Sequence, residues 1–198
     1  MPKVETFNKE LVLKQATEVF HTKSYSLTSM QDLVDATGLN RSSIYNTFGS
    51  KLGLYMDCLR SYQSDAHGKI QKIIKQTKGT KATLEAIFLL NVVKSTTGTD
   101  NGCLINNCTT EMANQETGIN QFLCNNQENM VQLFQSLVAQ GQEEGVFNTT
   151  QTHTEYGLYL LNAFQGLKIS GILSKDHKQL ESVVYTTLSV LNNLDTKV

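Results

Sequence analysis

NRSSIYNTFGSK, residues 40–51, is the stretch that decides the fold of this chain. Asn40 is well suited to cap a helix and Gly49 to end it, which leaves a helix of only about a turn and a half. Ile44 and Phe48 stand four residues apart, so they are expected to share the buried side of this helix. The other side chains are mostly polar, and a helix this short and polar needs a role outside the protein core.

The segment before this helix predicts two further helices. Apolar residues recur at helical spacing over residues 8–23, at Val12, Ala16, Val19 and Phe20. The triplet Ser24-Tyr25-Ser26 interrupts that pattern. Ser29 is then expected to cap a second helix, which has Asp32 in its first turn and Gly38 at its end. A capped helix, a tight turn at residues 38–40 and a short polar helix are the layout of a helix-turn-helix.

In a helix-turn-helix the second helix enters the major groove of DNA and turns its N-terminal residues toward the base edges. The outward side chains of the short helix are short donors and acceptors that suit this approach, and they are Arg41, Ser42, Ser43, Asn46 and Thr47. Arg41 can pair in a bidentate manner with guanine or with a phosphate. The sequence therefore predicts a DNA-reading helix.

The charges of the chain are unevenly distributed, although its formal net charge is only −1. Residues 1–82 contain 12 Lys and Arg against 7 Asp and Glu, a balance of +5, whereas residues 83–198 contain 5 against 11, a balance of −6. A basic N-terminal part favours a polyanionic partner. An uneven surface without such a partner remains the alternative. Lysines recur every third residue at positions 69, 72, 75 and 78 and predict a solvated face or an added DNA contact.

The rest of the chain is helical in pattern, with helices expected over residues 50–77, 80–94, 103–113, 116–144, 152–174 and 177–194. An all-α fold follows, with a helix-turn-helix DNA-binding domain over residues 1–52 and a larger helical domain over residues 53–198, to which the family resemblance described below assigns ligand binding and dimerisation. The N-terminal MPKVETFNKE is polar and charged, so no signal peptide is expected. No apolar run is long enough to span a membrane. A cytoplasmic protein without a membrane partner is expected.

The N-terminal segment resembles the DNA-binding domain of the TetR family of bacterial transcriptional regulators. The residues that carry the resemblance are Thr28-Ser29, Ala36 and Gly38 before the turn, and then Tyr45, Phe48 and Lys51. The resemblance implies a phosphate anchor at Thr28 and Ser29, recognition positions at Arg41, Ser42 and Ser43, and phosphate contacts from Tyr45 and Lys51. Asn46 and Thr47 depart from the family pattern, which affects the bases or phosphates that are touched. The alternatives are a core ring for Tyr45 and a solvated side chain for Lys51.

The same resemblance implies a homodimer and a pocket for a small inducer in the helical part. The implied pocket residues are Tyr62, Phe88, Asn91, Asn107, Phe122, Phe134, Tyr159 and Phe164. The implied dimer residues lie on the last two helices and are Ala163, Gly166, Ser170, Val183, Val184, Thr187 and Leu191. Ordinary core packing is the alternative for both sets. Few charges occur near the pocket residues, so a neutral or mostly apolar inducer is expected.

One cysteine suggests a second way of sensing. The Gly102-Cys103-Leu104 motif opens a predicted helix and resembles a TetR subgroup in which a cysteine here responds to electrophiles or oxidants. Thiols near a helix N-terminus can ionise more readily than free cysteine. Cys103 would then be the sensor, with Cys108 or Cys124 as a resolving partner. A buried inert cysteine is the alternative.

An enzyme is not expected, because no catalytic constellation can be assembled. Glu18 and His21 form a single Glu-x-x-His pair, whereas a di-iron bundle needs two such pairs and further carboxylates. The four cysteines form no Cys-x-x-Cys pair, so neither a zinc site nor a disulfide framework is expected. No metal and no cofactor are expected. A helical ligand-binding protein without DNA binding is the other rival. The sequence favours a ligand-responsive regulator, most simply a repressor that an inducer releases from a palindromic operator.

Overall fold

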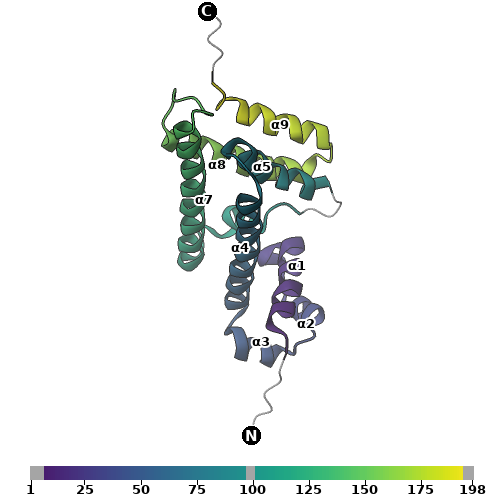
Figure 1. Ribbon diagram of the computed structural model, residues 1–198. Coiled ribbons are helices and arrows are strands. Elements are labelled where there is room, and N and C mark those ends of the chain that lie inside the picture. Colours follow the sequence, from purple (N-terminus) through teal and green to yellow (C-terminus); the bar gives the residue numbers. More distant parts are fainter. Residues whose placement is uncertain (1–6, 97–100, 194–198) are drawn as a thin grey trace, which may run out of the picture. The chain divides into compact units, whose positions relative to one another are not determined.

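The computed structural model describes residues 7–96 and 101–193 (Figure 1). These residues form helices and no strands, which confirms the all-α expectation. The helices of the described residues are α1 (Lys9–Leu27), α2 (Met30–Thr37), α3 (Arg41–Phe48), α4 (Lys51–Gln76), α5 (Thr80–Thr96), α6 (Leu104–Met112), α7 (Thr117–Glu143), α8 (His153–Leu173) and α9 (His177–Ser189).

The chain divides into two compact units. The first unit runs up to His67 and includes a segment from the middle of the sequence, Leu104–Asn120. The second unit consists of Gly68–Cys103 and the chain from Gln121 onward. Helices α4 and α7 therefore contribute residues to both units. The division into functional domains at residues 52 and 53 stays a prediction.

The caps predicted for the helix-turn-helix are confirmed. The side chain of Ser29 accepts from the N–H of Asp32, and that of Asn40 accepts from the N–H of Ser43. Gly38 ends α2 in the left-handed conformation at φ 69°, which glycine adopts without steric cost. Ser50 accepts from the N–H of Gly53 in the first turn of α4. These local bonds place α2 and α3 on either side of a turn three residues long.

Helix α1 extends to Leu27, four residues past its predicted end, but it is kinked where the sequence pattern breaks. Ser24 has φ 69° and ψ 168° inside the helix. Residues other than glycine rarely occupy this region, because it costs of order 1–3 kcal/mol and persists only where the surrounding structure holds it. The kink separates the regular part of α1 from the turn that leads into α2.

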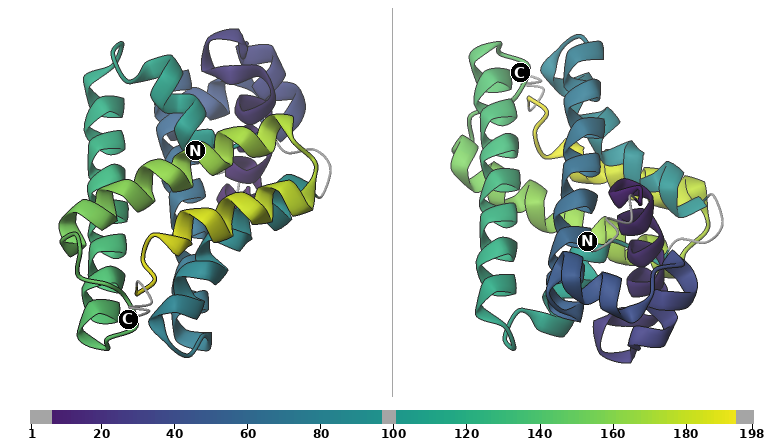
Figure 2. Two further views of the ribbon diagram at one scale, coloured as in Figure 1. Left: turned by 90° about the horizontal axis from the view of Figure 1, so that it is seen from above. Right: turned by 90° about the horizontal axis from the view of Figure 1, so that it is seen from below.

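The second unit has its core between α5, α7, α8 and α9. Helices α5, α8 and α9 pack on one another, and Figure 2 shows α8 and α9 side by side. Thr152 and Glu155 form a capping box that begins α8. Gly157 brings α8 close to α7, because a Cβ at this position would collide with the side chain of Gln135. The absence of that Cβ permits the tight packing of the two helices.

Helix α9 ends at Ser189, whereas the sequence pattern predicted a helix up to residue 194. Residue 194 lies outside the described residues. Asn148 holds the end of the helix: its N–H donates to Leu191 O at 2.9 Å, and its side-chain amide donates to Val190 O at 2.8 Å and to Asn192 O at 2.9 Å. The hydroxyl of Tyr156 donates to the amide oxygen of Asn148 at 2.7 Å. These bonds hold residues 190–192, which directly follow α9.

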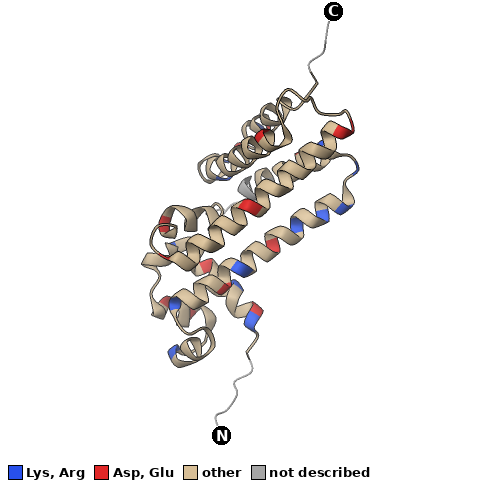
Figure 3. Cartoon of the chain, turned by 90° about the vertical axis from the view of Figure 1, so that its left-hand side faces the viewer, with Lys and Arg blue, Asp and Glu red and all other residues tan. Residues whose placement is uncertain are grey.

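Charged side chains are distributed over the helices as Figure 3 shows, with a row of basic residues along part of α4. Lys69, Lys72, Lys75 and Lys78 are all exposed, as a solvated face requires. A search of residues 7–96 and 101–193 reveals no helix with the length and apolar character needed to cross a membrane. The same residues contain no group of three or more His, Cys, Asp or Glu side chains that could hold a metal ion.

Candidate nucleic-acid interface

Helix α3 is anchored by two apolar side chains and is otherwise open to solvent. Ile44 is fully buried and Phe48 is nearly so, as the sequence predicts. The side chains of Arg41, Ser42, Asn46 and Thr47 are exposed. Ser43 is half-buried, and its N–H donates to the side chain of Asn40. The helix therefore has one fixed side and one polar side that a groove can accept.

Tyr45 belongs to the open side of α3. Its side chain is 46% exposed, so the alternative of a core ring is wrong. A tyrosine at the surface presents a hydroxyl that can donate to a phosphate oxygen. The contact itself stays a prediction.

Thr28 does not have the predicted role of phosphate anchor. Its side chain is only 2% exposed, and its hydroxyl donates to Ser24 O at 2.6 Å. A buried hydroxyl that already donates to a carbonyl within its own chain cannot reach a DNA backbone. The structure therefore assigns Thr28 to the stabilisation of the turn between α1 and α2.

Ser29 is exposed, but the N-terminus of α2 already holds an anion of its own. The carboxylate of Asp32 accepts from the N–H and the hydroxyl of Ser29, at 2.9 Å each, and from Lys23 Nζ at 2.7 Å. These hydrogen bonds, that of Lys23 first, lower the pKa of Asp32 to about 2. A phosphate at this helix end would meet the carboxylate. A Ser29 contact with DNA stays a prediction that has to overcome this repulsion.

Lys51 is engaged inside the first unit, so the alternative of a solvated side chain is wrong. Its ammonium donates to Tyr25 O at 2.9 Å and to Thr28 O at 2.8 Å. The same ammonium lies 4.3 Å from the centroid of the Tyr25 ring. An ammonium has three donors. Two of these N–H donors bond to the carbonyl oxygens of Tyr25 and Thr28, so only the third is left for the predicted contact with a phosphate.

Sequence reasoning missed the contribution of α6 to this unit. Glu111 lies on α6, and its carboxylate accepts from the N–H of Tyr25 at 3.0 Å and from the N–H of Ser26 at 2.7 Å. The residues joined by these bonds are 86 and 85 positions apart. No local pattern could have indicated the pairing, because an exposed-looking glutamate on an amphipathic helix carries no signal of a distant partner.

Comparison with known proteins agrees with this geometry. A family model described as bacterial regulatory proteins, tetR family, matches residues 12–58, which contain α2, the turn and α3. The HTH-type transcriptional repressor ComR of Escherichia coli (strain K12) is 32% identical over 144 residues, which are 64% of this chain and 67% of ComR. The chain belongs to the TetR family.

Similarity to TetR-family proteins extends over the whole chain. The uncharacterized HTH-type transcriptional regulator YezE of Bacillus subtilis (strain 168) is 24% identical over 195 residues, covering 97% of this chain and 100% of YezE. A cysteine mutant of the TetR family regulator CifR, solved in complex with 26 bp operator DNA, superposes with a TM-score of 0.83 at 19% identity. The superposition covers 96% of this chain and 98% of that one. This TetR-family chain is a helix-turn-helix regulator of transcription and not an enzyme.

The eight residues implied for an inducer pocket are divided between the two units. Phe88, Phe134 and Phe164 are buried against each other, with ring centroids 5.3–5.8 Å apart, and fill one another's space in the core of the second unit. Tyr62 and Asn107 are half-buried in the first unit. Phe122 and Asn91 are half-buried in the second unit, and Tyr159 is 41% exposed. A pocket formed by these residues stays a prediction, and the three packed rings favour the alternative of core packing.

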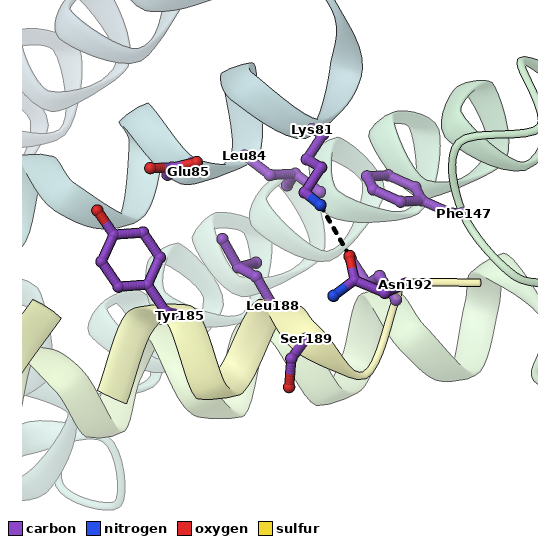
Figure 4. A pocket seen from close by; sticks show the side chains of 9 residues that line it. Lys81, Leu84, Glu85, Phe147, Tyr185, Leu188, Ser189 and Asn192 are labelled. Atoms are coloured by element: carbon purple, nitrogen blue, oxygen red, sulfur yellow. Dashed lines mark hydrogen bonds between the residues drawn. The ribbon is translucent and has the colours of Figure 1, made fainter. Parts of the chain in front are cut away.

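A hollow in the second unit lies between α5, the C-terminal part of α9 and Phe147 (Figure 4). Its volume is about 190 Å³, below the roughly 300–1,000 Å³ of typical ligand pockets. Lys81 crosses it to donate to the side chain of Asn192 at 2.9 Å. The lining residues are Lys81, Leu84, Glu85, Phe147, Tyr185, Leu188, Ser189, Leu191 and Asn192. None of the implied inducer residues is among them.

The implied dimer residues fall into two groups. Gly166, Ser170 and Val183 are exposed and Ala163 is half-buried, so all four can meet a partner. Three others belong to the core of their own subunit, namely Val184, Thr187 and Leu191, with exposures of 0%, 8% and 1%. The structure corrects their assignment, because a side chain already covered within the chain has no surface left for another subunit. Further apolar residues of α8 and the α9 segment are exposed, and they are Leu158, Tyr159, Ile169, Ile172, Leu173 and Val190.

Cys103 lies directly before α6 and has a cationic neighbour. The thiol is 5% exposed, and Lys168 Nζ donates to its Sγ at 3.8 Å. The same ammonium lies 4.3 Å from the ring centroid of Phe164. The two cysteines considered as resolving partners differ: Cys124 is exposed, whereas Cys108 is buried in the first unit, and desolvation raises the pKa of its thiol. The sequence indicated no cation for Cys103, because 65 residues separate it from Lys168.

Proposed function

We propose that this protein is a homodimeric, ligand-responsive repressor that binds a palindromic operator in the cytoplasm and leaves it when a small inducer binds. The observation that carries the proposal is the open polar side of α3, fixed from behind by Ile44 and Phe48. A short, rigid helix with Arg41 in its first turn suits insertion into a major groove. The repressors ComR and DhaR, which match this chain in sequence, support the direction of regulation.

Exposed apolar side chains support the dimer. Val183 on α9 and Ile169 and Leu173 on α8 are 43%, 53% and 88% exposed. Several apolar side chains exposed on two neighbouring helices are typical of a surface that another subunit covers. A dimer also multiplies the affinity of one half-site, because two half-sites, which in helix-turn-helix dimers lie about 34–36 Å apart, are bound together.

The inducer is proposed as a neutral or mostly apolar small molecule. It can release DNA only if it binds the state that does not bind DNA more tightly than the state that does. The ring cluster of Phe88, Phe134 and Phe164 is already filled by its own side chains. Inducer binding there would therefore require the rings to separate, and a pocket of this kind opens with the ligand.

A reporter gene tests the sign of regulation. The DNA directly upstream of the protein's own gene is placed before the reporter, and expression is compared with and without the protein. A repressor lowers expression from this promoter and leaves a promoter with a scrambled upstream segment unchanged. Higher expression in the presence of the protein would identify an activator and contradict the proposed sign.

We propose a thiol-based electrophile sensor as the second candidate, because Lys168 Nζ lies 3.8 Å from Cys103 Sγ. A cation at this distance attracts the anionic form of a thiol, which is the nucleophile. The thiolate would add to the β-carbon of an unsaturated carbonyl compound, so that an S–C bond forms and the π electrons move to the α-carbon. The Lys168 ammonium can supply the proton that completes the addition.

Substitution of Lys168 tests whether Cys103 is reactive or inert. Lys168→Met is expected to slow alkylation of Cys103 by N-ethylmaleimide, because the ammonium that lies beside Cys103 Sγ and can donate a proton to the adduct is lost. Mass spectrometry of the modified peptides gives the rate, and the exposed Cys124 in the same sample serves as the internal control. Equal rates for Cys103 in the two proteins would contradict the sensor, and Cys103→Ser should abolish any release of DNA by electrophiles.

A further inference from the structure

The turn between α1 and α2 is held in a conformation that its own sequence does not favour. Ser24 occupies φ 69° and ψ 168°, a region that essentially only glycine adopts without cost. The chain needs this turn because it leads directly to Ser29, the cap of α2, and through α2 to the reading helix α3. The direction in which α2 and α3 leave α1 therefore depends on bonds that hold the residues after Ser24.

Glu111 supplies two of these bonds from α6. Its two carboxylate oxygens accept from successive backbone donors, Oε2 from the N–H of Tyr25 at 3.0 Å and Oε1 from the N–H of Ser26 at 2.7 Å. Successive N–H groups that point in one direction form a concave site for an anion. Partial burial acts to raise the pKa of Glu111, but the hydrogen bonds from Ser26, Tyr25 and Ser24 outweigh it and lower the pKa. Glu111 is therefore held in its charged form.

Lys51 holds the carbonyl side of the same turn. Its ammonium donates to Tyr25 O and to Thr28 O, while the hydroxyl of Thr28 donates to Ser24 O. The Glu111 carboxylate thus accepts hydrogen bonds from the backbone N–H groups of the turn, and the Lys51 ammonium donates hydrogen bonds to its carbonyl oxygens. Both charged groups lie in the first unit, on α6 and at the start of α4.

We infer that Glu111 is a positioning residue for DNA recognition, which fixes the turn after Ser24 and with it the direction of α2 and α3. The inference rests on the proposed binding of an operator by this chain. It assigns α6, which lies far from the helix-turn-helix in sequence, a part in operator binding without a contact to DNA.

The direction in which DNA affinity changes after Glu111→Gln distinguishes a positioning role of Glu111 from a simple effect of its negative charge. DNA is a polyanion, so the loss of a negative charge near the reading helix should by itself strengthen binding or leave it unchanged. Glu111→Gln is expected to weaken binding instead, because a neutral amide offers one acceptor and places an N–H₂ group against the second backbone donor. Glu18→Gln is the matched control, since it makes the same change in net charge at an exposed position of α1.

The first test needs no DNA and no variant. Hydrogen exchange in the unmodified protein should be slow at the amides of Tyr25 and Ser26, because both donate to Glu111. Exchange of these two amides at the rate of an unstructured peptide would overturn the inference, whatever the protein binds. Slow exchange supports it, and faster exchange at the same two amides in Glu111→Gln is the expected companion result.

The second test measures operator and scrambled duplexes by fluorescence anisotropy. Glu111→Gln should bind the operator about tenfold more weakly and the scrambled duplex within twofold of the unmodified protein, whereas Glu18→Gln should change neither. Ser24→Gly in the Glu111→Gln background should recover a large part of the loss, because glycine adopts the strained conformation readily. Unchanged operator affinity in Glu111→Gln, or no recovery with Ser24→Gly, would contradict positioning. Absence of operator binding by the unmodified protein would instead count against the proposed function.

Discussion

Arg41→Ala is expected to weaken binding to the operator roughly fivefold to 150-fold, the range given by about 1–3 kcal/mol for one bidentate contact with a base. Arg41 is exposed in the first turn of α3, the part of a recognition helix that lies against base edges. Its side chain makes no contribution to the core, so the melting temperature should stay within about 1 °C. Anisotropy with operator and scrambled duplexes measures the change.

The chain contains its own control for this substitution. Arg60 is the other arginine of the sequence, and it is exposed on α4 with an ion pair to Asp57 at 3.4 Å. Arg60→Ala removes the same charge and the same side chain from a helix outside the helix-turn-helix. It should leave discrimination between operator and scrambled DNA unchanged. An equal loss from both substitutions would show that Arg41 acts only through charge, and no loss from Arg41→Ala would remove it from the interface.

Val183→Asp is expected to convert the protein into a monomer and to weaken operator binding about hundredfold or more. The side chain lies on the exposed face of α9, where a carboxylate would have to be buried without a partner if the subunits associated through this face. A monomer can use one half-site at a time and loses the gain from joining two. Sedimentation analysis measures the mass, and anisotropy measures the affinity.

Val146→Asp is the matched control for the dimer, because Val146 is 42% exposed and Val183 is 43% exposed. Val146 lies outside α8 and α9 in the same unit. The Val146→Asp protein should remain a dimer with unchanged affinity for the operator. A dimeric Val183→Asp protein would place the subunit interface on another face, and a monomeric Val146→Asp protein would show that any added charge has the effect.

The helix-turn-helix could be predicted from the sequence because its signals are local. Ser29, Gly38 and Asn40 act through bonds to residues three or four positions away, and the burial of Ile44 and Phe48 follows from their spacing. Both kinds of signal, the caps and the apolar spacing, depend only on residues within the helix-turn-helix itself. The same reasoning explains why the open side of α3 was predicted correctly.

The roles of Thr28 and Lys51 could not be predicted, because they depend on the turn after Ser24. The backbone there folds so that Thr28 bonds Ser24 O and Lys51 reaches two carbonyls. The family pattern places these residues at the edge of the interface but does not say which atoms their side chains meet. Glu111 shows the same limit, since its partners lie on a different helix.

The face that α8 buries was also beyond the sequence. Residues 158–161 of α8 read Leu-Tyr-Leu-Leu, and the structure exposes the first two and buries Leu160 and Leu161. A helix that is apolar all round has no periodic signal for its core side. Only packing against α5 and α7 decides which residues remain for a partner.

Fluorescence anisotropy on the DNA directly upstream of the protein's own gene tests the central claim most directly. A scrambled duplex is titrated alongside, at low and at moderate salt concentration. The account predicts tight binding to the upstream DNA alone, with log K falling by about 0.9 per unit of log salt concentration for each phosphate contact. Binding to neither duplex at low salt would contradict the assignment of α3 as a DNA-reading helix.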